Sequence, residues 1–241
     1  MVREMVTNLK DIDVIILCGG LGTRLRPAIS DRPKALAKID DKTFLDILID
    51  DVLKHGFKNI ILCVGYLKER IKDHFNYEKD YNIDFSEEDY PLGTGGALNN
   101  AKSLIKSDTF MVMNGDSICN VDFKDFFDFH IYRKATLSMV LTRSHDGEDY
   151  GNVVLDDSQN IICFKEKVDN KGQCLINAGV YMMQKEIFSY MPDETIFSLE
   201  YDLFPKLINN KCYGYIIENE LLDIGTPERY KKAINIIGGK Q

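Results

Sequence analysis

Glycine and arginine are concentrated in the turn LCGGLGTRLRP, residues 17–27, which follows a short apolar run. Three glycines in this turn can bend the backbone sharply and bring its N–H groups close to an anion: Gly19, Gly20 and Gly22. Arg24 adds positive charge inside the turn, and Lys34 follows in the stretch RPKAL. These residue types at this spacing predict a cradle for a polyphosphate. A glycine turn with solvated arginines is the alternative that the fragment alone leaves open.

Two common phosphate-binding loops do not fit this turn. A Rossmann dinucleotide fingerprint needs a third glycine where Leu25 stands, and a P-loop needs the sequence Gly-Lys-Ser/Thr, which the chain lacks. The turn therefore predicts a phosphate site of another kind.

Two aspartates are candidate metal ligands because each follows an apolar run. Asp116 closes the run FMVM through NGD, and Asp223 comes directly after Leu221 and Leu222. Carboxylate oxygens suit Mg²⁺, which takes one or two protein carboxylates and completes its shell with waters and phosphate oxygens. Taken singly, each aspartate is more typical of a turn residue.

The elements that must position these residues are short strands alternating with helices. Apolar runs of strand length are VIIL (14–17), IILCV (60–64), FMVM (110–113), TLSMVLT (136–142), NVVL (152–155), IICF (161–164) and GVYMM (179–183). Helical patterns are TFLDILIDDVLKHG (43–56), TGGALNNAKSLI (94–105) and VDFKDFFDFHIYRK (121–134), and Thr226-Pro227 is typical of a helix start.

This order predicts right-handed βαβ crossovers and a doubly wound, mainly parallel sheet through about residue 116, with antiparallel or mixed strands after it. Ligands of open α/β sheets bind beyond the carboxyl ends of the strands. The glycine turn and Asp116 both fall at such ends.

Length and composition indicate one globular domain, residues 1–241, with a nucleotide-binding lobe over about 12–116 and a second lobe over about 117–230. A net charge of −8 argues against general binding to nucleic acid or anionic membranes. The first residues lack the apolar core of a signal peptide, and no apolar run is long enough to span a bilayer. Six separate cysteines without a C-x-x-C pair fit reduced thiols, so we expect a cytoplasmic protein.

The full pattern L-x-G-G-x-G-T-R-L-x-P, followed by P-K-A-L, closely resembles the signature of the sugar-1-phosphate nucleotidyltransferases. Five further segments resemble motifs of that family in the same order: EDYPLGTGGAL (88–98), NGD (114–116), FKEK (164–167), NAGVY (177–181) and DIGTPERY (223–230). Within the family, the chain is most similar to the short D-glycero-α-D-manno-heptose 1-phosphate guanylyltransferases. The resemblance implies a GT-A-like, Rossmann-like mixed sheet with helices on both faces.

The activity implied by this resemblance is transfer of a guanylyl group from GTP to a sugar 1-phosphate, with heptose 1-phosphate as the first choice. GDP-heptose and pyrophosphate would be the products, Mg²⁺ the cofactor, and nucleotide-sugar biosynthesis for capsule or lipopolysaccharide the setting. Two anions then react by in-line displacement, so catalysis rests on positioning and charge neutralisation.

The resemblance also implies a role for each matching residue. The nucleotide would be bound by Leu17, Gly19, Gly20, Gly22, Thr23, Arg24, Lys34, Glu88, Gly93 and Asp116, of which Arg24, Lys34 and Asp116 would act in catalysis. Metal would lie on Asp116 and Asp223, and the sugar phosphate on Gly151, Glu166, Lys167 and Asn177.

Some of these assignments have explicit alternatives. Glu88 would bind the guanine base through its two carboxylate oxygens, which are hydrogen-bond acceptors. If the match to the family motif is shifted by one residue, Glu87 would have that role instead. Without the family, Glu166 and Lys167 would be alternating charges on the exposed side of a strand. Gly95-Gly96 stands where relatives often have Ala-Gly, which is expected to loosen the helix start without changing the site. No motif explains residues 1–12.

Other functions remain as alternatives. The nearest is the same chemistry with mannose 1-phosphate or with UTP. A nucleotide-sugar glycosyltransferase typically needs a D-x-D motif after an early strand, whereas the only instance, Asp11-Ile12-Asp13, precedes the first strand. A non-catalytic nucleotide-binding regulator would not need to retain both aspartates with Arg24 and Lys34. Expected partners are GTP and a sugar 1-phosphate, without nucleic acid or membrane, and a homodimer is the default oligomer.

Overall fold

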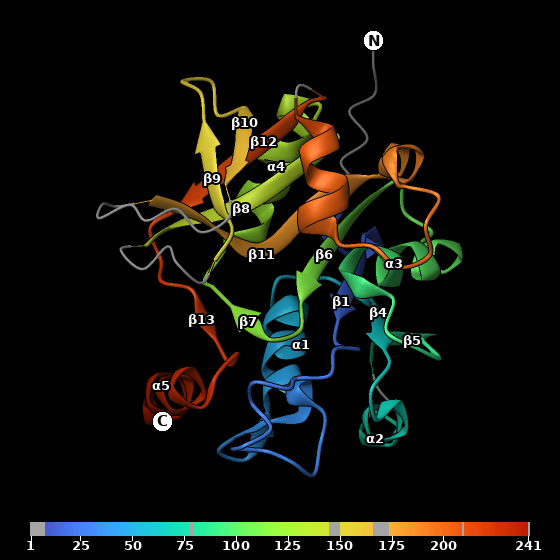
Figure 1. Cartoon of the computed structure of the whole chain (residues 1–241), viewed down its shortest axis with the longest axis vertical. Coiled ribbons are helices and arrows are strands. Elements are labelled where there is room, and N and C mark those ends of the chain that lie inside the picture. The colour runs from blue at the N-terminus through green and yellow to red at the C-terminus, as the bar shows by residue number, and fades with distance from the viewer. Residues whose placement is uncertain (1–7, 78–79, 145–149, 166–173, 209, 241) are drawn as a thin grey trace.

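A mixed sheet of nine strands runs through the part of the chain that the computed structural model describes, residues 8–77, 80–144, 150–165, 174–208 and 210–240 (Figure 1). Strands follow one another in the order β10-β9-β11-β6-β1-β4-β5, while β8 also pairs with β11 and β12 pairs with β8. The sheet strands are β1 (Asp13–Leu17), β4 (Asn59–Val64), β5 (Asn82–Glu87), β6 (Thr109–Asn114), β8 (Leu137–Ser144), β9 (Asn152–Leu155), β10 (Ile161–Lys165), β11 (Cys174–Gln184) and β12 (Cys212–Ile217).

The first half of the sheet is parallel, as its alternation of strand and helix predicts. β1 lies between β4 and β6, with Val14 opposite Ile60 on one side and Met111 on the other. The carboxyl ends of these strands therefore meet at one edge of the sheet, which is where the glycine turn and Asp116 emerge.

The second half is mixed, also as expected. The long strand β11 runs antiparallel to β6, β8 and β9, so it joins both halves in one sheet. Its register shifts between Asn177 and Tyr181, where Gly179 has a φ of +74°. Two short ribbons complete the strands: β2 (Lys38–Ile39) with β3 (Lys42–Thr43), and β7 (Ser117–Ile118) with β13 (Leu222–Asp223).

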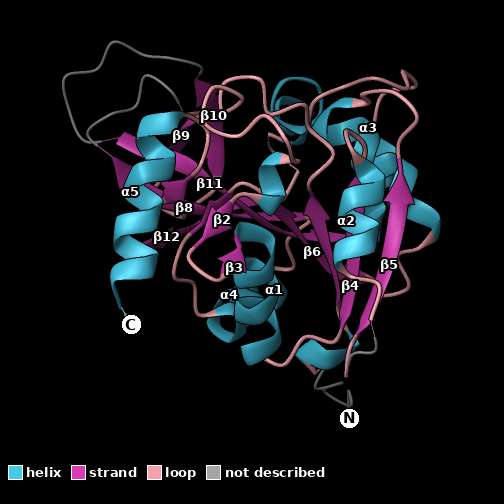
Figure 2. Cartoon of the chain, turned by 90° about the horizontal axis from the view of Figure 1, so that it is seen from below, coloured by secondary structure: helices cyan, strands magenta, loops and turns pink. Residues whose placement is uncertain are grey.

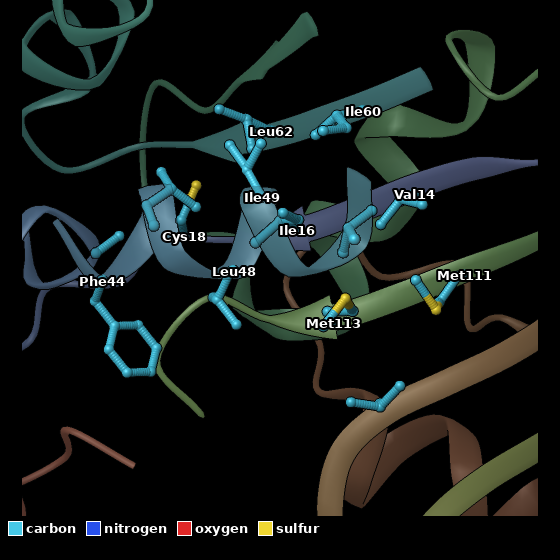
Figure 3. Close-up of a cluster of buried hydrophobic side chains, with 14 of the residues drawn as sticks. Val14, Ile16, Cys18, Phe44, Leu48, Ile49, Ile60, Leu62, Met111 and Met113 are labelled. Atoms are coloured by element: carbon cyan, nitrogen blue, oxygen red, sulfur yellow. The ribbon is translucent and has the colours of Figure 1, made fainter. Parts of the chain in front are cut away.

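Helices cover both faces of the sheet, which confirms the predicted architecture (Figure 2). On the first face, α1 (Phe44–Lys54) and α4 (Phe123–Arg133) pack on alternate strand residues such as Val14 and Ile16. Figure 3 shows Leu48 and Ile49 of α1 in the same cluster as these strand residues. On the second face, α3 (Gly93–Asn100) and the segment Leu199–Leu203 pack on Ile15.

Local signals set the ends of the helices. A capping box begins α1, because Thr43 Oγ1 accepts from the Asp46 N–H while Asp46 accepts from the Thr43 N–H. Thr226 caps α5 (Pro227–Ile237), because its Oγ1 accepts from the Arg229 N–H, and proline stands at the first position as predicted. The remaining helix is α2 (Lys68–His74). None of the helices in the described part of the chain combines the length and apolar composition that a membrane crossing needs.

Candidate active site

A hollow of about 430 Å³ opens at the carboxyl ends of β1 and β6. Seven predicted nucleotide-binding residues line it: Leu17, Gly20, Gly22, Thr23, Arg24, Lys34 and Asp116. Sequence reasoning missed its other lining residues, which are Cys18, Leu21, Ala35, Pro91, Gly115 and Gly225. The fold thus gathers around one space residues that lie as far apart in the chain as Leu17 and Gly225.

Two glycines of the turn are required by its geometry. Gly22 has a φ of +58°, a conformation that glycine adopts without strain, and a Cβ there would lie 3.0 Å from Lys34 Cβ. A Cβ on Gly19 would lie 2.8 Å from Glu88 Oε1. Glycine at these positions therefore lets the turn approach both Lys34 and Glu88.

Positive charge at the hollow comes from Lys34 and Arg24. Lys34 is largely buried, with 13% of its side chain exposed, and its Nζ lies 2.5 Å from Asp116 Oδ2. Arg24 is exposed and makes no ion pair with any described residue. One cation is therefore held against a carboxylate, while the other remains available to an anion from solvent.

Asp223 lies beside Asp116 because β13 pairs with β7. The N–H of Ile224 donates to the backbone oxygen of Asp116 over 3.0 Å, and the N–H of Gly225 donates to Asp223 Oδ1 over 2.7 Å. Arg229 Nη1 lies 3.5 Å from the same Oδ1. The two predicted metal ligands are thus adjacent, and each has a cationic side chain next to it.

Arg229 and Tyr150 are site residues that sequence reasoning did not single out. The hydroxyl of Tyr150 donates to Asp223 Oδ2, and the Arg229 guanidinium lies 4.7 Å from the centre of the Tyr150 ring. Arg229 stands inside the DIGTPERY segment and Tyr150 precedes Gly151, so both were adjacent to motifs already recognised. What the sequence lacked was a signal that these two segments touch.

The donor set at this edge fits Mg²⁺. Asp116 and Asp223 offer hard carboxylate oxygens, the ligands that this ion prefers. Across the described ranges no group of three or more His, Cys, Asp or Glu gathers to hold a metal by itself. Two carboxylates beside a phosphate cradle match an ion that completes its shell with substrate oxygens and water.

Glu88 faces the glycine turn and is 8% exposed. Its Oε2 accepts from the N–H of Leu92 over 3.1 Å, and burial raises the pKa of its carboxyl. Glu87 points elsewhere: it contacts Lys72 over 2.9 Å and Lys68 over 3.4 Å, and the hydrogen bond from Lys72 holds the pKa of Glu87 below its usual value. Of the two neighbours, only Glu88 lies next to the turn.

Gly93 does not line the hollow but begins α3 with a φ of +75°. A Cβ on Gly93 would lie 2.5 Å from the backbone oxygen of Phe197, which also accepts from the N–H groups of Gly95 and Gly96. The N–H groups of Gly95 and Gly96, which have no partner within the first turn of α3, are therefore bonded by Phe197. Gly95 has a further reason to be glycine, because its Cβ would lie 2.3 Å from the Phe197 ring.

On the predicted acceptor side, the structure brings Gly151 and Asn177 together. The N–H of Asn177 donates to the oxygen of Gly151 over 3.0 Å, and a Cβ on Gly151 would meet nothing within 4 Å. The Asn177 side chain bonds Gly179 N and Tyr181 Oη across the β11 irregularity. Glu166 and Lys167 lie outside the described residues.

A second hollow, of about 670 Å³, lies on the other side of Asp223. Among its lining residues are Arg143, Tyr150, Arg229 and Lys232. Lys232 contacts Glu220 and Arg143 lies 3.7 Å from Glu218, so acidic neighbours compensate these two cations.

The D-x-D sequence Asp11-Ile12-Asp13 does not belong to the site. Asp13 begins β1 at the opposite edge of the sheet and is 4% exposed, and its Oδ2 accepts from the N–H groups of Lys106 and Ser107. It anchors a loop there, which removes the feature that a glycosyltransferase would need.

Comparison with known proteins finds relatives over most of the chain. A family model described as nucleotidyl transferase matches residues 13–238. The chain is 39% identical to the D-glycero-α-D-manno-heptose 1-phosphate guanylyltransferase of Aneurinibacillus thermoaerophilus, covering 92% of this chain and 96% of that one. It is 31% identical to the mannose-1-phosphate guanylyltransferase of Mycobacterium tuberculosis, over 92% of this chain and 63% of that one.

Among solved structures, HddC from Yersinia pseudotuberculosis complexed with GMP-PN superposes with a TM-score of 0.82 and 33% identity, covering 94% of this chain and 99% of that one.

Proposed function

Because this chain belongs to the nucleotidyl transferase family, we propose that it transfers a guanylyl group from GTP to D-glycero-α-D-manno-heptose 1-phosphate. The products would be GDP-heptose and pyrophosphate. One observation carries the proposal: the glycine turn, Lys34 and Asp116 converge on one hollow with Asp223 beside Asp116, in a chain similar over nearly its whole length to a heptose 1-phosphate guanylyltransferase.

Positioning and charge account for the chemistry. The sugar phosphate is already ionised near neutral pH, so its oxygen can attack the α-phosphorus of GTP without a strong general base, and pyrophosphate leaves in line. Backbone N–H groups of the turn would hold the triphosphate. The guanidinium of Arg24 would stabilise the negative charge that develops on the leaving pyrophosphate. Asp116 and Asp223 would hold Mg²⁺, which supplies further neutralisation of phosphate oxygens.

Base selection would depend on Glu88. Guanine presents two adjacent donors, N1–H and the 2-amino group, and a carboxylate presents two acceptors at a matching separation. Glu88 is the carboxylate that lies against the glycine turn, whereas Glu87 is held by two lysines. The orientation of Glu88 toward the turn supports a preference for GTP over UTP. The uracil base of UTP would place its carbonyl oxygens against the Glu88 carboxylate, and the two would repel each other.

The two predicted lobes divide these tasks. Residues 12–116 supply the turn, Lys34, Glu88 and Asp116. Residues 117–230 supply Asp223 and the acceptor side, where Gly151 and Asn177 already lie together and Glu166 and Lys167 are expected to join them.

A matrix of four nucleoside triphosphates against heptose, mannose and glucose 1-phosphates tests the proposal, with pyrophosphate release and product mass as readouts. We expect release only when GTP, acceptor and Mg²⁺ are all present, with the highest kcat/KM for heptose 1-phosphate. A preference for mannose 1-phosphate would instead support mannose-1-phosphate guanylyltransferase activity, the activity named for the Mycobacterium tuberculosis relative. Release without any sugar phosphate would contradict the proposed transfer.

A further inference from the structure

Asn114 is a polar residue at the carboxyl end of β6 for which the chemistry above has no task. It lies opposite Leu17 of β1, and its chain neighbour Gly115 donates its N–H to the oxygen of Leu17 over 2.9 Å. Leu17 and Gly115 both line the hollow. Asn114 itself is not among the residues that line the hollow, but it directly precedes two that do, Gly115 and Asp116.

The Asn114 side chain points to the second face of the sheet. Val112, two residues earlier, packs in the hydrophobic cluster of that face, and alternate residues of a strand share a face. On the same face and at the same edge lies Tyr181, whose hydroxyl accepts from Asn177 Nδ2. Asn114 thus shares its surroundings with the residues expected to meet the acceptor.

The side chain of Asn114 lies directly against Gly179, which belongs to the predicted acceptor side. A Cβ on Gly179 would lie only 2.7 Å from Asn114 Nδ2, so the absence of a side chain at Gly179 makes room for this amide. Gly179 in turn donates its N–H to Asn177 Oδ1, and Asn177 donates its N–H to Gly151. Asn114 is therefore placed between Asp116 and the pair Gly151 and Asn177.

Among the residues that the structure describes, Asn114 Oδ1 is sealed from solvent yet has no hydrogen-bond partner. A buried polar atom without a partner costs free energy, so folding stability alone gives no reason for an amide at this position. An amide both donates and accepts, which suits it to sugar hydroxyls.

Resting on the function proposed above, we infer that Asn114 is an acceptor-binding residue that hydrogen-bonds a hydroxyl of the sugar 1-phosphate. The attacking phosphate must reach the α-phosphorus beside Asp116, so the attached sugar ring lies close to this edge. Asn114 then selects the acceptor and orients it, while GTP binding depends on other residues.

Asn114→Leu tests this inference, because leucine has a similar size and no polar group. We expect kcat/KM for the sugar 1-phosphate to fall by about ten- to a hundredfold, with the KM for GTP changed less than about twofold. The melting temperature of the free protein should stay the same or rise, since an unpaired buried oxygen is removed. Asn59→Leu, at the opposite edge of the sheet, is the matched control and should leave the kinetics unchanged.

Monodeoxy sugar 1-phosphates separate contact from indirect effects. With the one analogue that lacks the recognised hydroxyl, the unaltered protein and Asn114→Leu should have equal kcat/KM; equal sensitivity with every analogue would overturn the contact. Unchanged acceptor kinetics in Asn114→Leu, or a matching rise in the KM for GTP, would overturn the assignment while leaving the proposed function intact.

Two further outcomes complete the test. If Asn114→Leu unfolds at a much lower temperature, Asn114 is structural and the inference fails, and Asn114→Ala provides the second check. If the unaltered protein uses no sugar 1-phosphate, the inference and the proposed function fall together.

Discussion

At the residue scale, the site is a balance of opposite charges drawn from distant parts of the chain. Lys34 lies 2.5 Å from Asp116, and Arg229 lies 3.5 Å from Asp223. Each carboxylate thus has a cation beside it before any substrate arrives. The reaction adds two phosphorylated anions, so charge neutralisation is the main demand on these four side chains.

Asp116→Asn and Asp223→Asn should each lower turnover by at least about a hundredfold, because each removes one negative charge from the proposed metal site and should leave the fold unchanged. Pyrophosphate release at saturating substrates measures the loss, and chelation of Mg²⁺ should reproduce it. Asp128→Asn, on the exposed side of α4, is the control and should keep full activity. Full activity of either site variant at low Mg²⁺ would remove that aspartate from the metal site.

Glu88→Gln should reduce the preference for GTP over UTP by about ten- to a hundredfold, the effect of about 1–3 kcal/mol for a bidentate base contact. Glu87→Gln is the matched control, because Glu87 binds lysines of α2 instead of facing the turn. The ratio of kcat/KM values at saturating acceptor is the measurement. An unchanged ratio in Glu88→Gln would reopen the choice of nucleotide.

Part of this site was predictable from residue types and motifs, and part was not. The composition of the glycine turn predicts an anion-binding site. The family motifs predicted that Lys34 and Asp116 act in the same site, although 82 residues separate them in the chain. Arg229 and Tyr150 were missed because an arginine in a helix and a tyrosine in a loop carry no signal until folding brings them to Asp223. Contacts of this kind depend on the packing of α5, which no local pattern encodes.

At the element scale, the start of α3 depends on packing with a segment a hundred residues away. The backbone oxygen of Phe197 accepts from the N–H groups of Gly95 and Gly96. The N–H of Phe197 donates to the backbone oxygen of Leu92. Leu92 also donates to Glu88, so this junction supports the candidate base-reading side chain. The unusual Gly95 is explained by the Phe197 ring that occupies the space of its missing Cβ.

Gly95→Ala should destabilise the protein by about 1–3 kcal/mol through overpacking, partly offset by about 1 kcal/mol from the better helix propensity of alanine. Denaturant unfolding measures the change. In a Phe197→Leu background, which relieves the contact, the same substitution should be neutral or stabilising. An equal cost in both backgrounds would show that the ring is not the cause.

Strands with a continuous apolar run were predictable from the sequence, and elements with mostly polar residues were not. All seven runs form strands, including β10 at the edge of the sheet. In the central strands such a run follows from burial on both faces. β5, with the sequence NIDFSE, was missed because it is an edge strand with polar residues on alternate positions. The helix α2 was missed since KERIKDH buries only Ile71 and therefore shows no apolar face.

At the scale of the whole molecule, one sheet joins both halves of the chain, and a polar network lies between this sheet and α4. His130 of α4 is fully buried, and its Nδ1 lies 2.9 Å from the Oγ of Ser138 on β8. Its Nε2 lies 3.2 Å from the amide nitrogen of Gln184 on β11, which also donates to Thr109 Oγ1. A ring whose Nε2 faces a donor is neutral, with the proton on Nδ1.

Stability should therefore fall in acid because of this one ring. Burial lowers the pKa of His130 to about 3, whereas an unfolded histidine titrates near 6.5. Below about pH 6.5 the unfolded chain binds a proton that the folded chain does not, so the free energy of unfolding decreases as the pH falls toward 3. Between pH 6.5 and 4.5 the loss should be about 2 kcal/mol.

The comparison of the protein with His130→Gln isolates this contribution, because glutamine is polar but does not titrate. Urea unfolding at several pH values gives the free energy of unfolding of each, and all carboxylates contribute equally to both. The variant should be less stable at neutral pH, where its hydrogen bonds are poorer, and the difference should shrink by about 2 kcal/mol toward pH 4.5. If the two curves instead run parallel, the acid sensitivity of this fold lies in its carboxylates and not in His130.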